Sequence, residues 1–149
     1  MSPPPLLVLG WGNPSRGDDA LGPLCIEHLR ALGLSAQRVE YLEDFQLQIE
    51  HALDLVGRER VLLVDASLNC AAPFEVTQPQ PAHDANQMSH ALAPAALLQV
   101  YLELCHAPPP PCTLLAIRGE RFELGESPSA AALSNLAAAV QWARTWLNT

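Results

Sequence analysis

The sequence has few basic residues and no long apolar run. It carries 8 Lys and Arg residues against 16 Asp and Glu, so the net charge is −8. This balance argues against nucleic acid as a partner, because nucleic-acid binding relies on clustered basic side chains. It leaves room for a cationic peptide or a metal ion. Since no apolar run reaches about 18 residues, we expect no transmembrane helix and no membrane partner.

Other common signatures are also missing. The start, Met-Ser-Pro-Pro-Pro, has no basic segment and no cleavage site, so we expect no signal peptide and a cytoplasmic protein. The 4 cysteines form no C-x-x-C pair and are expected to be free thiols. Neither a G-x-S-x-G nucleophile elbow nor an H-E-x-x-H zinc helix is present. Cys105 and His106 are neighbours that would not face each other on a helix, which gives a cysteine protease little support.

The pattern of apolar residues predicts the fold of a single domain, residues 1–149. Short apolar runs predict strands over 6–9, 38–42, 61–64, 74–77 and 113–117. Helical spacing predicts helices over 20–32, 46–56, 94–104 and 130–147, the second built on Leu47, Ile49, Leu53 and Val56. Strands that alternate with helices indicate an α/β fold, with a mostly parallel sheet covered on both faces. The polar segment 78–89 shows no regular pattern, and loops of that length are often functional.

The most informative segment is a glycine-rich turn, residues 12–22, directly after the first predicted strand. Its two adjacent carboxylates, Asp18 and Asp19, fall where a helix should begin. Helix starts favour negative charge, and glycine-rich turns of this kind usually hold a phosphate there. An acidic turn is a poor phosphate cradle and a plausible cation site. The simpler alternative is that the two residues only cap the helix.

A third carboxylate is expected at the same edge of the sheet. Asp65 closes the clearest predicted strand, and the carboxyl ends of parallel strands gather where ligands bind in such sheets. His90 lies at the end of the long polar loop, with His83 as its rival in the same loop. Two carboxylates and one imidazole suit a borderline divalent ion and leave positions open for water or substrate. The alternatives to these ligand roles are that Asp65 only caps the following turn and that His90 is only an exposed loop residue.

A dinucleotide site is a further alternative for the glycine-rich turn. Residues 10–15 are nearly G-x-G-x-x-G, with Ser15 in place of the third glycine. However, Asp18 and Asp19 would then face a pyrophosphate, and the repulsion between like charges is costly.

Several motifs together resemble one known family. They are LVLGWGNPSRGDDALG at 7–22, VLLVDA at 61–66, SHALAP at 89–94 and RGERFELGESP at 118–128. In this combination and order they resemble the hydrogenase maturation endopeptidases, which remove a C-terminal extension from the precursor of a nickel-iron hydrogenase large subunit after nickel insertion. The segment DFQLQIE at 44–50 departs from the glycine- and threonine-containing turn of many members. It resembles the subgroup that matures soluble, bidirectional NAD-reducing hydrogenases.

The resemblance implies a fold, a site and a partner. The fold would be a three-layer sandwich with a five-stranded, mostly parallel, twisted sheet. By motif, the residues that contact nickel fall on Asp19, Asp65 and His90, and many relatives have a glutamate in place of Asp19, so Asp18 is a second candidate for this contact. Asp19 or Asp65 could act as the base, and Asn13 and Asp18 would bind substrate. The nickel would arrive with the precursor, to which this protein would bind as a monomer; a metal-checking chaperone that does not cut is the alternative.

Overall fold

A computed structural model describes residues 2–83 and 92–149, which fold into a three-layer α/β sandwich. The sheet has five strands in the order β2-β1-β3-β5-β4. They are β1 (Leu6–Trp11), β2 (Val39–Asp44), β3 (Arg60–Ser67), β4 (Phe74–Thr77) and β5 (Cys112–Arg118). All neighbours are parallel except β4, which runs antiparallel to β5 at one edge. The predicted fold class is confirmed.

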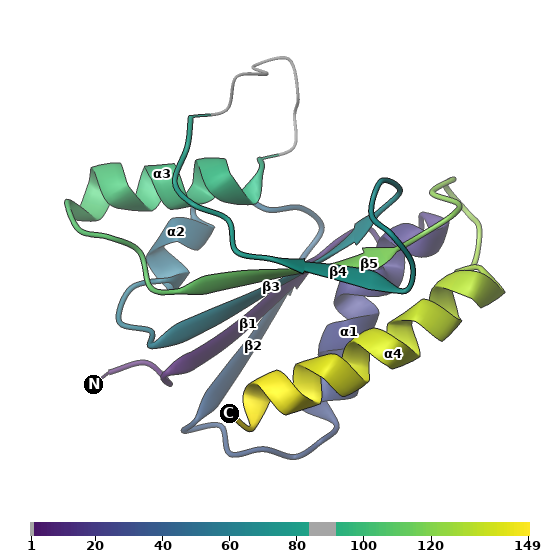
Figure 1. Ribbon diagram of the computed structural model, residues 1–149, viewed down its shortest axis with the longest axis horizontal. Coiled ribbons are helices and arrows are strands. Elements are labelled where there is room, and N and C mark those ends of the chain that lie inside the picture. Colours follow the sequence, from purple (N-terminus) through teal and green to yellow (C-terminus); the bar gives the residue numbers. More distant parts are fainter. Residues whose placement is uncertain (1, 84–91) are drawn as a thin grey trace.

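Helices cover both faces of this sheet (Figure 1). One face carries α2 (His51–Asp54) and α3 (Pro94–Cys105), and the other carries α1 (Leu21–Arg30) and α4 (Ala130–Leu147). A short 3-10 helix, η1 (Gly17–Ala20), leads directly into α1. In the described residues, no helix has both the length and the apolar character needed to cross a membrane.

Side chains of the central strands alternate between two apolar cores, one on each face. Leu7 and Leu9 of β1 belong to the core under α2 and α3, while Leu6 and Val8 belong to the core under α1 and α4. All four are at most 4% exposed. Burial on both faces explains why the central strands are continuous apolar runs rather than alternating ones. The four cysteines are free, as expected.

The predicted helix over 46–56 is wrong in both its length and its buried face. Only His51–Asp54 is α-helical, and the residues around it form turns with i→i−3 hydrogen bonds, such as Ala52 N–H to Ile49 O at 3.0 Å. Leu47 is buried, as the prediction requires, and the tight turns bring His51, Ala52 and Leu55 inward with it. Ile49, Leu53 and Val56, by contrast, are 57%, 67% and 45% exposed.

Candidate active site

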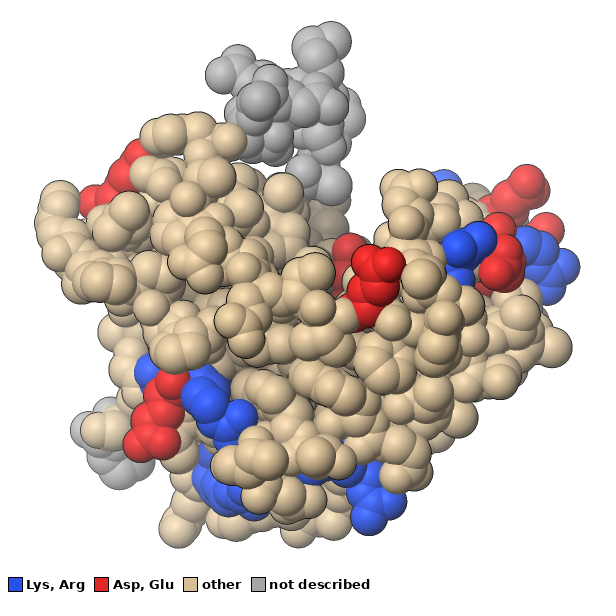
Figure 2. Space-filling view, viewed as in Figure 1, with Lys and Arg blue, Asp and Glu red and all other residues tan. Residues whose placement is uncertain are grey.

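The carboxyl ends of β1, β2 and β3 meet at one edge of the sheet. Trp11 pairs with Asp44 of β2, and Gly10 pairs with Val64 of β3, one residue before Asp65. The glycine-rich turn leaves β1 at the same level. Figure 2 shows acidic side chains beside a hollow at this end of the sheet. The topology therefore brings the turn and Asp65 together, as the parallel arrangement predicts.

Two glycines let the end of β1 touch the start of the helix directly. A Cβ atom on Gly12, whose φ is +148°, would lie 1.9 Å from the backbone oxygen of Asp19. A Cβ atom on Gly22 would lie 2.2 Å from the backbone oxygen of Trp11. No side chain fits at either position. The absence of both side chains holds Asp19 directly beside the strand end.

Asp19 presents a partly exposed carboxylate at this edge. Its Oδ2 atom accepts a hydrogen bond of 2.7 Å from the Asn13 backbone N–H. The Asn13 side chain itself accepts the Ser15 N–H at 2.9 Å, which closes the turn. In this way the turn fixes the direction of the Asp19 carboxylate. It also uses a backbone N–H that a bound phosphate would need, which weighs against the dinucleotide alternative.

Asp65 is the group with the most unusual acidity in the site. Burial and, to a smaller extent, the negative charge of nearby Asp19 raise the pKa of its carboxyl to about 7. Hydrogen bonds from the Ala66 N–H, at 2.8 Å, and from the Trp11 side chain lower this pKa but do not offset the burial. A carboxyl with a pKa near neutrality can take up and release a proton at physiological pH, as a general acid or base must.

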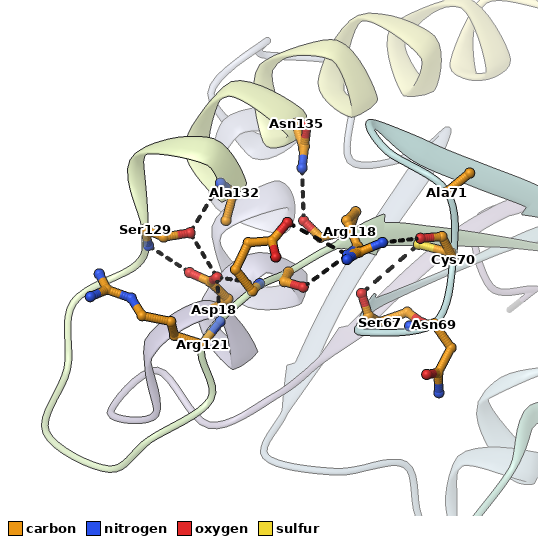
Figure 3. A network of polar contacts seen from close by, with 12 residues as sticks. Asp18, Ser67, Asn69, Cys70, Ala71, Arg118, Arg121, Ser129, Ala132 and Asn135 are labelled. Carbon is orange, nitrogen blue, oxygen red and sulfur yellow. Dashed lines mark hydrogen bonds and ion pairs between the residues drawn. The ribbon is translucent and has the colours of Figure 1, made fainter.

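Asp18 lies on the other side of the turn and is fully buried. Its Oδ2 accepts hydrogen bonds from the Glu120 N–H at 2.7 Å, the Arg121 N–H at 3.0 Å and the Ser129 hydroxyl at 2.8 Å. Its Oδ1 accepts the Ser129 N–H at 2.6 Å, and Figure 3 shows these contacts to the loop before α4. Burial raises the pKa of Asp18, but these hydrogen bonds outweigh it and leave the pKa below its usual value. The arrangement favours Asp19 over Asp18 as the carboxylate that faces the site, while substrate binding by Asp18 stays a prediction.

A cleft of about 240 Å³ opens beside the turn. Its walls come from the glycine-rich turn, α1 and the end of β2, and the lining residues are Gly12, Pro14, Pro23, Glu43, Asp44 and Phe45. Asp44 Oδ2 lies 3.3 Å from His51 Nε2, and His51 Nδ1 accepts the Gln48 N–H at 2.8 Å. Since Nδ1 accepts this hydrogen bond, Nε2, the ring nitrogen nearer Asp44, carries a proton. Asp44 was not predicted in the site, although it ends the parallel strand β2 beside the end of β1.

The third residue of the predicted metal-contacting set cannot be placed. His90 lies outside the described residues, so its meeting with Asp19 and Asp65 stays a prediction. Its rival His83 is described: its side chain is 80% exposed and its Nε2 lies 3.7 Å from Glu103 Oε1. Within residues 2–83 and 92–149, no three His, Cys, Asp or Glu side chains are grouped closely enough to hold a metal ion.

The fold is similar to that of solved structures of nickel-iron hydrogenase maturation proteases. The maturation protease HycI from Thermococcus kodakarensis KOD1 matches with a TM-score of 0.75 and 20% identity, over 97% of this chain and 92% of that one. The maturating endopeptidase HybD from E. coli matches with a TM-score of 0.73 and 21% identity, over 99% and 93% of the two chains. A scan against protein-family models and a search of curated proteins found no match. At these identities the likeness shows a shared fold across nearly the whole chain.

Proposed function

We propose that this protein is an endopeptidase that removes the C-terminal extension of a nickel-iron hydrogenase large-subunit precursor after nickel insertion. The observation that carries the proposal is the pair Asp19 and Asp65, brought to one sheet edge with the pKa of Asp65 raised to about 7. The shared fold with HycI and HybD supports it, because their names describe this class of protease. The motifs that resemble the family run along the same chain.

In this proposal the nickel belongs to the substrate. The metal is held by cysteines of the precursor and docks onto Asp19, Asp65 and His90, which fill its open coordination positions. Carboxylate and imidazole ligands suit such an ion. Docking places the scissile peptide bond in the cleft beside Gly12 and Asp44. A precursor without nickel lacks this contact, so binding reports that insertion is complete.

Hydrolysis then follows from the acidity of the site. The oxygen of a water molecule attacks the scissile carbonyl carbon, and Asp65 accepts the water proton, since its raised pKa makes it the better base. The developing oxyanion is stabilised by the side-chain NH2 group of Asn13, since the backbone N–H groups of the turn are bonded within the protein. The carbon–nitrogen bond breaks and the proton held by Asp65 passes to the leaving amine.

We further propose the soluble, bidirectional NAD-reducing type of hydrogenase as the substrate. The segment 44–50 carries this assignment because it resembles that subgroup, and its first two residues, Asp44 and Phe45, line the cleft. The protein would act on this precursor as a monomer in the cytoplasm.

The test is incubation of the purified protein with nickel-loaded and nickel-free precursor, followed by mass spectrometry. The proposal expects loss of a C-terminal peptide from the loaded form alone. Cleavage of both forms would keep the peptidase and remove nickel as the recognition element. An unchanged mass of a verified cognate precursor would contradict the peptidase and favour the chaperone alternative, which shares the docking site but does not shorten its partner.

Variants of the two loop histidines test the assignment of His90. His90→Ala should leave the melting temperature unchanged and abolish cleavage. His83→Ala is the matched control from the same loop and should cleave normally. Normal processing by His90→Ala would remove His90 from the site.

A further inference from the structure

The segment between β2 and β3 exposes an apolar stripe that the proposed peptidase chemistry does not use. The stripe consists of Phe45, Ile49, Leu53 and Val56, which are 67%, 57%, 67% and 45% exposed. Ile49, Leu53 and Val56 lie three or four residues apart along α2 and the tight turns around it, and Phe45 precedes them directly after β2. A helical segment at the surface of a globular protein normally turns a polar side to water.

The stripe is not the inward face of its own segment. The inward side is made by Leu47, Ala52 and Leu55, each at most 3% exposed and packed in the core under α2 and α3. The segment is therefore apolar on both sides, and only one side is covered by this chain. Large apolar side chains exposed together in this way mark interaction surfaces.

Two observations identify what covers the stripe. First, it is continuous with the candidate active site, because Phe45 also lines the cleft beside Gly12 and Asp44. Second, the segment that carries the stripe is itself acidic: between Val39 and Gly57 the chain has no Lys or Arg, and five acidic residues, namely Glu40, Glu43, Asp44, Glu50 and Asp54. Glu40 and Glu43 pair with Arg58 and Arg30, and Asp44 lies beside His51, whereas Glu50 and Asp54 have no ion-pair partner among the described residues.

We propose that the stripe Phe45, Ile49, Leu53 and Val56 docks the folded body of the protein substrate, through an apolar patch edged by Lys and Arg side chains. This inference rests on the proposed function, because the substrate enters through the cleft that Phe45 lines. The cleft holds the segment to be cut, and the stripe holds the rest of the partner. Apolar contacts give the affinity, and the acidic margin favours a basic partner surface.

The test compares two exposed helical leucines in the nickel-loaded precursor assay. Leu53→Ser is expected to raise KM about tenfold and to leave kcat within about twofold, and Ile49→Ser in addition should raise KM further. Leu133→Ser, at a 46% exposed leucine of α4, is the control and should change neither value. Melting temperatures of all variants should match the wild type, since these side chains lie outside the core. Equal KM values for Leu53→Ser and Leu133→Ser would overturn the proposal.

A charge variant tests the acidic margin. Glu50→Arg is expected to raise KM several-fold, whereas Glu27→Arg, at an exposed position of α1 on the other face, should not. Binding of the precursor measured by calorimetry separates the docking proposal from the peptidase. Binding without cleavage that Leu53→Ser weakens would keep the stripe and discard the peptidase, while wild-type protein that does not bind the precursor would discard both. Self-association in ultracentrifugation that Leu53→Ser abolishes would show a second copy on the stripe and overturn the proposal.

Discussion

Asp18 and Asp65 are two shielded carboxyl groups at the same end of the sheet, and their surroundings drive their acidity in opposite directions. Asp18 receives hydrogen bonds from three backbone N–H groups and one hydroxyl, and its pKa lies below the usual value. Asp65 receives one from the Ala66 N–H and one from the Trp11 side chain, and burial together with the charge of Asp19 raises its pKa to about 7. The number of donors decides which of the two stays ionised.

The difference separates an anchor from a reactive group. A carboxylate surrounded by donors is stabilised as an anion and fastens the loop 119–129 to the turn that carries Asp19. A buried carboxyl group with few hydrogen-bond donors lowers the stability of the fold when it is ionised. Groups of this kind are found mostly at functional sites. Asp19 lies between the two roles, since it is partly exposed and bonded to the Asn13 N–H.

The largest effect is expected when a carboxylate on the reactive side is neutralised. Asp19→Asn should lower kcat/KM for the nickel-loaded precursor by about a thousandfold, because the variant loses both the negative charge and the proposed contact to nickel. The fold should survive, because the amide oxygen can still accept the Asn13 N–H. Cleavage rates check the loss of activity, and thermal melting of the same preparations checks that the fold is intact. Activity within tenfold of the wild type would remove Asp19 from the chemistry.

Neutralising the anchor should act on stability instead. Asp18→Asn places an amide among three N–H donors and should lower the free energy of unfolding by about 3 kcal/mol at pH 7. The sign with pH follows from the lowered pKa: the stabilisation by wild-type Asp18 is present above the usual aspartate pKa and disappears as the pH falls through the folded-state value. Urea unfolding at pH 7 and pH 3 measures this stabilisation. The difference in the free energy of unfolding between variant and wild type should shrink at the lower pH. A constant difference would contradict this role of the charge.

Asp65→Asn should change stability in the opposite direction. The raised pKa of Asp65 means that its contribution to stability is present below the usual aspartate pKa and is lost as the pH rises to about 7. The variant should therefore be more stable than the wild type by about 2 kcal/mol at pH 8, after allowance for the partial exposure of the side chain. At pH 4 the two proteins should unfold alike. A variant less stable than the wild type at pH 8 would show that Asp65 is held as an anion.

The smallest effect concerns the hydroxyl that supports the anchor. Ser129 Oγ donates to Asp18 at 2.8 Å and caps α4 by accepting the Ala132 N–H at 3.2 Å. Ser129→Ala should cost about 1 kcal/mol of stability and leave precursor cleavage unchanged, because the three backbone donors to Asp18 remain. Chemical denaturation together with the cleavage assay checks this. A large loss of precursor cleavage in a folded Ser129→Ala variant would contradict this prediction and show that the contacts of Asp18 are needed for catalysis.

Local patterns were enough for the strands and for the sheet edge where Asp19 and Asp65 meet. The continuous apolar run of β3 and the glycine-rich turn after β1 each have one physical interpretation, and parallel pairing brings their ends together. The different roles of Asp18, which is buried, and Asp19, which faces the site, could not be predicted. They depend on Ser129 and the loop 119–129, which lie over 100 residues away in the sequence. Of the residues that predicted the helix over 46–56, Leu47 is buried but Ile49, Leu53 and Val56 are exposed, because the tight turns around α2 set an inward side that apolar spacing alone does not show.

The most direct measurement is the mass of the nickel-loaded large-subunit precursor after incubation with wild-type protein and with the Asp65→Asn variant. We expect the wild type to remove a C-terminal peptide, and the folded variant to leave the precursor at full length. An intact precursor after incubation with the wild type, or equal shortening by both proteins, would contradict the account.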